Sequence, residues 1–144
     1  MSWQDMLKLK LILGNWSGHM ADKESVTTLV IIDDEPIVGR RLKQVFTKMG
    51  YNVEIFTNPI EAVDYMRDNP FDIVVTDFKM EEIDGMEVLR KAKEFNQDSR
   101  VIIITGYAKP ETAKEAFKNG VFDFMVKPFR LEELKNAVNR AAKT

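Results

Sequence analysis

Cysteine is absent from the 144-residue sequence, and histidine occurs once, as His19. Without cysteine there is no disulfide framework, no thiol nucleophile and no cysteine-bound zinc, and one histidine cannot build a histidine-rich metal centre. Any chemistry must therefore rest on carboxylates, hydroxyl groups and lysine.

Three further shortages narrow the functional class. No uninterrupted apolar run reaches the roughly 18 residues that a membrane-spanning helix needs. The 21 Lys and Arg are outnumbered by 23 Asp and Glu, so the basic field of a non-specific nucleic-acid binder is missing. Only seven glycines occur, and none forms a phosphate cradle after the first apolar run, which disfavours a flavodoxin-like nucleotide-binding module. We expect a cytoplasmic protein that contacts neither membrane nor nucleic acid directly.

The first 27 residues differ in character from the rest and are interpreted as an N-terminal extension to a domain over 28–144. Ser2 and Asp5 have capping-box spacing before an apolar stretch, which favours a short amphipathic helix. The alternation of Leu and Lys over 7–11 would equally suit a strand. Residues 17–20 resemble those left by a cloning junction, so a native extension and an expression-vector remainder both stay open.

From residue 28 onward, short apolar runs alternate with segments of helical spacing. The runs predict strands over 29–32, 53–56, 73–76, 101–105 and 121–126. The intervening segments, 37–49, 60–66, 86–92, 112–118 and 131–138, predict helices. Five repeats of strand and helix favour an α/β fold in which helices cover both faces of a parallel sheet.

Reactive side chains follow these strands. Parallel strands place their carboxyl ends at one edge, where such folds bind ligands. The residues at this edge are Asp33, Asp34 and Glu35 after the first run, Asp77 after the third, Thr105 after the fourth and Lys127 after the fifth.

The chemistry of this set points to phosphoryl transfer. Asp33, Asp34 and Asp77 would crowd negative charge into one site, which a hard divalent cation such as Mg²⁺ relieves. Lys127 and Thr105 supply an ammonium and a hydroxyl that stabilise phosphoryl oxygens. One carboxylate remains free to act as the nucleophile.

Four segments in order resemble the two-component response-regulator receiver domain, over about 28–142. They are Ile31-Ile32-Asp33-Asp34-Glu35-Pro36, Val74-Val75-Thr76-Asp77-Phe78-Lys79-Met80 with Asp84-Gly85, Ile103-Ile104-Thr105-Gly106, and Phe124-Met125-Val126-Lys127-Pro128-Phe129. The resemblance implies a doubly wound, flavodoxin-like sheet of five parallel strands in the order 2-1-3-4-5, like that of chemotaxis regulators.

The resemblance also assigns roles to the site. It implies that Asp77 accepts the phosphoryl group, and that Asp33, Asp34, Asp77 and the backbone carbonyl of Lys79 hold Mg²⁺. Thr105 would contact the phosphoryl group, and Lys127 would pair with it. The Lys127–Pro128 peptide bond would be cis.

The same resemblance suggests how a signal leaves the domain. A histidine kinase would supply the phosphoryl group, and Thr105 with Phe124 would switch a surface used by an output domain, an effector protein or a second copy. Many relatives have Tyr at the position of Phe124, so this chain has no hydroxyl to expose there. Glu111-Thr112-Ala113 and the segment 120–124 are similar to receivers that precede ATPase-type transcription activators. We therefore expect a signalling receiver that catalyses its own phosphorylation and dephosphorylation, and not a turnover enzyme.

Glu81, like Phe124, departs from the pattern of many receivers. Glu81 stands where many receivers have Pro, which adds charge near the metal site and changes the stiffness of the loop. The alternative, a Mg²⁺-dependent phosphatase that forms an aspartyl phosphate, typically needs an acidic residue two positions after its nucleophile. Lys79 occupies that position here.

Overall fold

The computed structural model describes residues 2–5 and 26–144, and the second range is an alternating α/β domain. Its elements in chain order are β1 (Thr28–Ile32), α3 (Pro36–Lys48), β2 (Asn52–Phe56), α4 (Pro59–Asp68), β3 (Ile73–Asp77), α5 (Gly85–Phe95), β4 (Arg100–Thr105), α6 (Pro110–Lys118), β5 (Asp123–Val126) and α7 (Leu131–Lys143). None of the helices in the described ranges is both long and apolar enough to cross a membrane.

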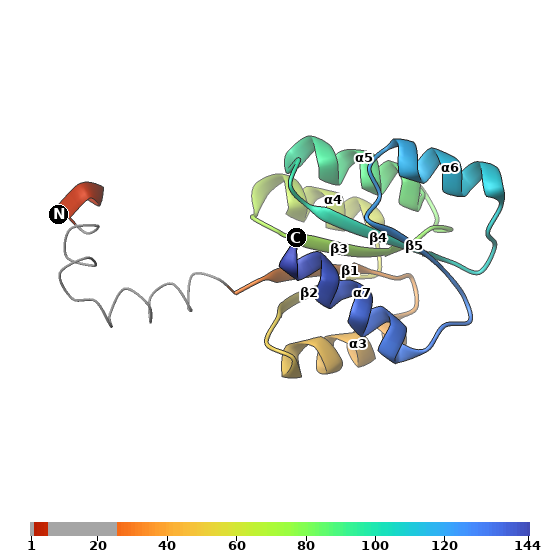
Figure 1. Cartoon of the computed structure of the whole chain (residues 1–144), viewed down its shortest axis with the longest axis horizontal. Helices are drawn as coiled ribbons and strands as arrows, with labels where there is room; N and C mark the ends of the chain where they lie inside the picture. The colour runs from red at the N-terminus through yellow and green to blue at the C-terminus, as the bar shows by residue number, and fades with distance from the viewer. Residues whose placement is uncertain (1, 6–25) are drawn as a thin grey trace.

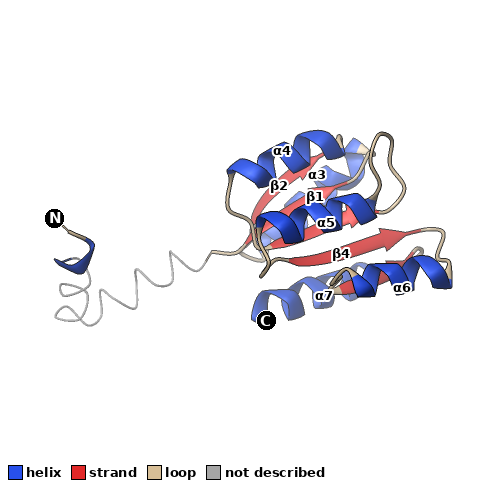
Figure 2. Ribbon diagram, turned by 90° about the horizontal axis from the view of Figure 1, so that it is seen from above, coloured by secondary structure: helices blue, strands red, loops and turns tan. Residues whose placement is uncertain are grey.

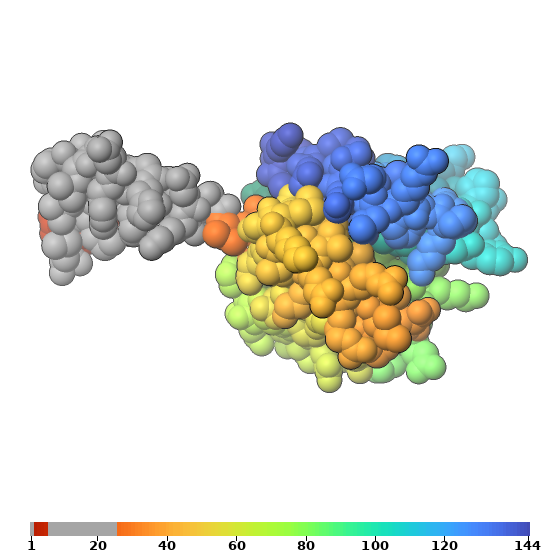
Figure 3. Space-filling model, turned by 90° about the horizontal axis from the view of Figure 1, so that it is seen from below, coloured from red at the N-terminus to blue at the C-terminus, as the bar shows by residue number. Residues whose placement is uncertain are grey.

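The strands form one parallel sheet in the order β2-β1-β3-β4-β5. Helices α4, α5 and α6 cover one face, and α3 and α7 cover the other (Figure 1, Figure 2). Figure 3 shows α3, in orange to yellow, beside the blue α7 on the second face. The structure thus confirms the expected doubly wound sheet and its strand order.

Alternation along the strands divides the core into two layers. In β1, Val30 and Ile32 pack beneath α4–α6, whereas Leu29 and Ile31 pack beneath α3 and α7. All four are at most 1% exposed. Because both faces of the sheet are buried, its inner strands need apolar residues at successive positions, which is why these strands read as unbroken apolar runs in the sequence.

Helix ends follow local signals. Proline begins α3, α4 and α6, where its missing N–H costs no hydrogen bond. Gly50 and Gly120 follow α3 and α6 with φ of 99° and 87°, a left-handed conformation that favours glycine. The N–H of Val121 then donates to the carbonyl of Ala116 at 3.0 Å and closes the end of α6.

This closure corrects one predicted boundary. The last strand was expected over 121–126, but β5 begins at Asp123. Val121 is buried because it caps the preceding helix, and its apolar character therefore resembles that of a strand residue.

The predicted capping box is present at the N-terminus. The Ser2 hydroxyl accepts the Asp5 N–H at 3.1 Å, and the Asp5 carboxylate accepts the Ser2 hydroxyl at 2.8 Å. Residues 3–5 are helical. The rest of the helix expected there, and the suspected cloning junction, lie outside the described residues.

Candidate functional site

Four strand ends bring the predicted site residues to one edge of the sheet. Asp33 follows β1, Asp77 ends β3, Thr105 ends β4 and Lys127 follows β5. Main-chain hydrogen bonds continue past the strands and fix their ends, including one of 2.8 Å from the Lys127 N–H to the Thr105 carbonyl. The site is therefore set by the sheet register and not by loop flexibility.

Three carboxylates meet at this edge. Asp33, Asp34 and Asp77 each place one oxygen so that all three oxygens lie within 4.8 Å of one another. Asp33 and Asp77 are half-buried, and Asp34 is exposed. Asp33 Oδ1 also accepts the N–H of Glu35 at 2.8 Å, which orients its carboxylate. The three oxygens provide the hard donors that Mg²⁺ prefers.

Burial raises the pKa of the Asp33 carboxyl above its ordinary value of 3.8. The Asp77 and Asp34 carboxylates raise this pKa further through repulsion, while the Glu35 N–H and the Lys127 ammonium act in the opposite direction. Proton binding to Asp33 is favoured first by burial of the carboxyl and then by the excess negative charge of the cluster. A divalent cation would relieve the same excess.

Lys127 reaches the cluster from the end of the edge strand β5, which β4 separates from β3. Its Nζ lies 3.3 Å from Asp77 Oδ2, with the lysine side chain 40% exposed and that of Asp77 13% exposed. The ammonium is thus beside the carboxylate that the sequence predicts as the acceptor. The following peptide bond, Lys127–Pro128, is cis, as expected.

Thr105 is buried and turned towards its own loop. Its Oγ1 accepts the Tyr107 N–H at 3.0 Å and lies 3.4 Å from the Tyr107 carbonyl oxygen, to which it donates. Only 1% of Thr105 is exposed. No hydrogen bond joins this hydroxyl to Asp77 in the described part of the chain, so a contact with a phosphoryl group on Asp77 requires the hydroxyl to turn.

Gly85 has a role that the sequence pattern alone did not reveal. A Cβ at this position would lie 2.8 Å from both the Asp77 carbonyl oxygen and Phe78 Cα. The Gly85 N–H donates to the Phe78 carbonyl at 2.7 Å. The start of α5 therefore presses directly on the backbone of the candidate acceptor. Asp84 caps this helix by accepting the Glu87 N–H at 3.0 Å.

The loop between β3 and α5 contains Lys79 and Glu81. Lys79 is exposed and places its ammonium 5.7 Å from the centre of the Tyr107 ring. The Glu81 carbonyl accepts the Ile83 N–H at 2.9 Å, and Glu82 between them has φ of 72°, which is costly for a non-glycine residue. Tyr107 was not among the residues predicted for the site. The feature of the sequence that could have indicated its place beside the site is its position two residues after Thr105.

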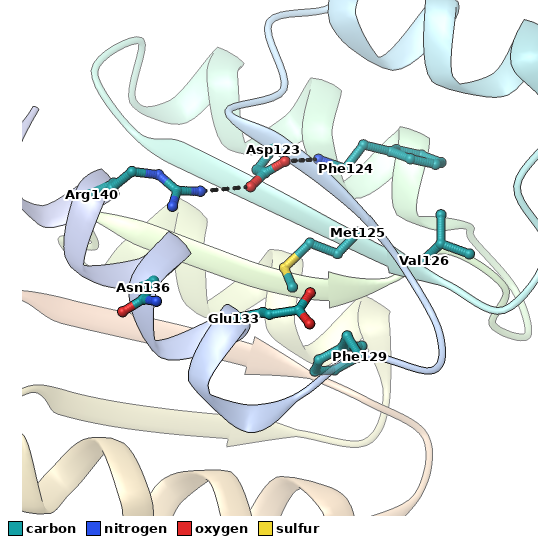
Figure 4. A pocket seen from close by; sticks show the side chains of 8 residues that line it. All are labelled: Asp123, Phe124, Met125, Val126, Phe129, Glu133, Asn136 and Arg140. Carbon is teal, nitrogen blue, oxygen red and sulfur yellow. Dashed lines mark hydrogen bonds and ion pairs between the residues drawn. The ribbon is translucent and has the colours of Figure 1, made fainter.

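Phe124 lies on β5, opposite Ile103 of β4. Its half-buried ring packs with the layer beneath α4–α6, whereas the next residue, Met125, belongs to the layer beneath α7. Between β5 and α7 runs a groove of about 400 Å³ (Figure 4), beside which Arg140 pairs with Asp123 at 3.1 Å. The predicted switch residue thus lies at the edge strand, next to an open surface.

Comparison with models of protein families identifies the class of domain to which this chain belongs. The model of the response regulator receiver domain matches residues 29–139. The chain belongs to this family of signalling domains, which act in two-component phosphorelays.

Its relatives include complete receivers and longer regulators. The chain is 31% identical over 112 residues to sporulation initiation phosphotransferase F of Bacillus subtilis, which covers 78% of this chain and 90% of that protein. It is 36% identical over 117 residues to the regulatory protein AtoC of Escherichia coli, covering 81% of this chain and 25% of AtoC. The chain is also 33% identical over 125 residues to the transcriptional regulatory protein ZraR of Klebsiella oxytoca, and this match covers 87% of this chain and 27% of ZraR. The chain therefore spans about a quarter of the length of these two regulators.

Solved structures agree with the fold. A response regulator receiver domain protein from Clostridium thermocellum superposes with a TM-score of 0.75 at 30% identity, covering 82% of this chain and 95% of that one. A receiver domain from Methanospirillum hungatei superposes with a TM-score of 0.78 at 24% identity, and the match covers 82% of this chain and 94% of that one. The receiver fold predicted from the four sequence segments is thereby confirmed.

Proposed function

We propose that Asp77 accepts a phosphoryl group from a histidine kinase, with Mg²⁺ held by Asp33, Asp34, Asp77 and the backbone carbonyl of Lys79. The observation that carries this proposal is the position of Asp77, whose carboxylate lies among two others and 3.3 Å from the Lys127 ammonium. Bound Mg²⁺ would supply positive charge that offsets the carboxylates and the phosphoryl oxygens.

The residues of the chain itself perform the transfer. An ionised oxygen of Asp77 attacks the phosphorus, the bond between phosphorus and the donor imidazole breaks, and the imidazole leaves with the electron pair. Lys127 then pairs with a phosphoryl oxygen, and Thr105 donates its hydroxyl hydrogen to another. The product is an aspartyl phosphate, which the same site loses to water. In this proposal the chain is a signalling receiver that does not turn over other substrates.

The rival proposal, a phosphatase that forms an aspartyl phosphate, is not favoured. The family that matches residues 29–139 is the receiver family. Lys79 extends its ammonium over the Tyr107 ring, so the position two residues after Asp77 lacks the acidic side chain that such a phosphatase typically needs.

The test is the intact mass of the protein after incubation with acetyl phosphate, with and without Mg²⁺. We expect the mass of one phosphoryl group to be added only when Mg²⁺ is present. Asp77→Asn should abolish the gain, whereas Asp98→Asn, in an exposed turn before β4, should leave it unchanged. Labelling of Asp77→Asn at the parent level would show that the acceptor is another residue.

We further propose that phosphorylation reaches the surface through Thr105 and Phe124. When the Thr105 hydroxyl turns to the phosphoryl group, it leaves space that the ring of Phe124 can enter, which alters the face formed by α6, β5 and α7. An output domain, an effector or a second copy would read this face. Supporting features are the register of β4 and β5 and the open groove beside β5.

Sedimentation velocity tests this route. Beryllofluoride with Mg²⁺ should strengthen self-association of the parent, because it mimics the phosphoryl group on Asp77. Thr105→Ala should still be labelled at Asp77 but should not associate more strongly. Equal association of the two proteins would place the coupling outside this hydroxyl.

We also assign the signalling activity to residues 28–144 alone. Every proposed site residue lies within this range. Deleting residues 1–19 should leave labelling unchanged, and a large loss would make the extension part of the site.

A further inference from the structure

Two loops beside the candidate site are joined by an interaction between Lys79 and Tyr107. Lys79 lies two residues after Asp77, and Tyr107 lies two residues after Thr105. The Lys79 ammonium is 5.7 Å from the centre of the Tyr107 ring, within the range of a cation–π interaction. Tyr107 is 72% exposed, so the position of its ring is not imposed by burial in the core.

The backbone of Tyr107 also holds the hydroxyl of Thr105. The Tyr107 N–H donates to Thr105 Oγ1 at 3.0 Å, and this oxygen lies 3.4 Å from the Tyr107 carbonyl. A threonine hydroxyl has one hydrogen to donate. As long as that hydrogen points at the Tyr107 carbonyl, it cannot bond a phosphoryl oxygen on Asp77.

These contacts form one chain from the acceptor segment to the switch residue. Lys79 is carried by the backbone that follows Asp77, and its ammonium contacts the ring of the residue whose main chain engages Thr105. A phosphoryl group attracts an ammonium more strongly than the face of a ring does, because the former interaction is a charge-assisted hydrogen bond. A phosphoryl group on Asp77 that the Lys79 side chain can reach would therefore compete with the ring for the ammonium.

We propose that the Lys79–Tyr107 pair is a latch that keeps the Thr105 hydroxyl turned towards Tyr107 in the unphosphorylated protein. A phosphoryl group on Asp77 opens the latch by drawing the ammonium away from the ring, which frees the Tyr107 loop to release Thr105. The latch regulates the same site and rests on the proposed function. It lowers the apparent affinity for a phosphoryl group, because part of the binding free energy is used to open it.

The test measures the dissociation constant for beryllofluoride at saturating Mg²⁺ by calorimetric titration. Tyr107→Leu keeps an apolar side chain and the backbone N–H but removes the ring, so we expect binding to become about two- to five-fold tighter, as for an exposed cation–π pair. Tyr107→Phe keeps the ring and should bind like the parent. In a Lys79→Met background, Tyr107→Leu should change nothing, since the latch is already broken.

An NMR measurement gives an independent readout. Without beryllofluoride, the amide resonance of Gly106 in Lys79→Met, which keeps the Tyr107 ring beside this amide, should move part of the way towards its position in the beryllofluoride-bound parent. This shift reports a change in the population of the released loop, which a simple loss of stability would not produce.

The outcomes separate the latch from the proposed function. If the parent does not bind beryllofluoride, or if Asp77→Asn binds it equally well, the proposed function fails. If the parent binds through Asp77 but Tyr107→Leu has the parent affinity, the latch is wrong. An equal effect of Tyr107→Leu with and without Lys79 would likewise overturn the pairing.

Discussion

Replacing Asp33 by asparagine should stabilise the metal-free protein, because it removes a charge from the cluster and keeps the local geometry. The Asn side-chain oxygen can still accept the Glu35 N–H that Asp33 Oδ1 accepts at 2.8 Å. What disappears is chiefly the cost of burying a charge, together with the repulsion from Asp77 and Asp34 and the attraction to Lys127. The substitution therefore isolates electrostatics from hydrogen bonding.

The separation of the carboxylates sets the magnitude. Two unit charges 4.8 Å apart repel by about 0.9 kcal/mol in water and about 3.5 kcal/mol at an effective dielectric constant near 20. Two such repulsions are partly cancelled by the ammonium, and the site is open to solvent screening. We expect Asp33→Asn to raise the free energy of unfolding by about 1–2 kcal/mol, or the Tm by about 4–8 °C.

Magnesium should reverse this ranking. At a concentration one hundred times its Kd, Mg²⁺ stabilises the folded parent by about 2.7 kcal/mol, which exceeds the advantage of Asp33→Asn, whereas Asp33→Asn has lost a ligand and should gain little. Thermal unfolding with EDTA and with Mg²⁺ measures both effects. The matched control is Asp72→Asn, which also loses one negative charge but lies at the opposite end of the strands, where its carboxylate accepts the Thr28 N–H at 2.8 Å.

Two results would refute the reasoning. One is a metal-free Asp33→Asn that is no more stable than Asp72→Asn. The other is a Mg²⁺-induced rise in Tm that is the same in Asp33→Asn as in the parent. The first would mean that the carboxylates do not repel measurably, and the second would mean that Asp33 does not contribute to the metal site.

Three further outcomes are expected. Gly85→Ala should lower the free energy of unfolding, measured in urea, by about 1–3 kcal/mol, because the added methyl group overpacks against the Asp77 segment. It should also slow labelling by acetyl phosphate. The control, Gly106→Ala, has open space where its Cβ would lie and should keep the parent labelling rate. Lys127→Met should leave the fold intact by circular dichroism but slow labelling of Asp77 at least ten-fold, the effect of about 1.4 kcal/mol on a barrier; an unchanged rate would deny this ammonium a part in transfer. The pKa of Asp33 is raised in the folded state, so the stability that its protonated form contributes to the metal-free protein is present in acid and is lost as the pH rises through that pKa. The higher free energy of unfolding of Asp33→Asn, measured by urea titration, should therefore vanish below about pH 3.8.

The sequence predicted the features that depend on short-range patterns. The inner strands are recognisable because burial on both faces demands successive apolar residues, as in β4, and the site residues are recognisable because parallel strands end at one edge. The start of β5 was misplaced because Val121 is buried for a different reason, the closure of α6. Sequence spacing cannot separate those two causes of burial.

Contacts between loops were beyond reach from the sequence. The Lys79–Tyr107 pair and the approach of Gly85 to the Asp77 backbone depend on how segments converge after the sheet has formed. A lysine and a tyrosine 28 positions apart carry no signal of contact by themselves. The unfavourable φ of Glu82 likewise follows from the path of its loop.

The order of the strands has a consequence for how the chain is synthesised. All three carboxylates precede Lys127 in the chain and are synthesised before it, and β5, the last strand, lies at the outer edge of the sheet. A nascent chain that has folded only through β4 would hold the acidic cluster without the ammonium that pairs with Asp77. In such a chain, addition of the final strand would complete the sheet and bring the ammonium to the cluster in one event.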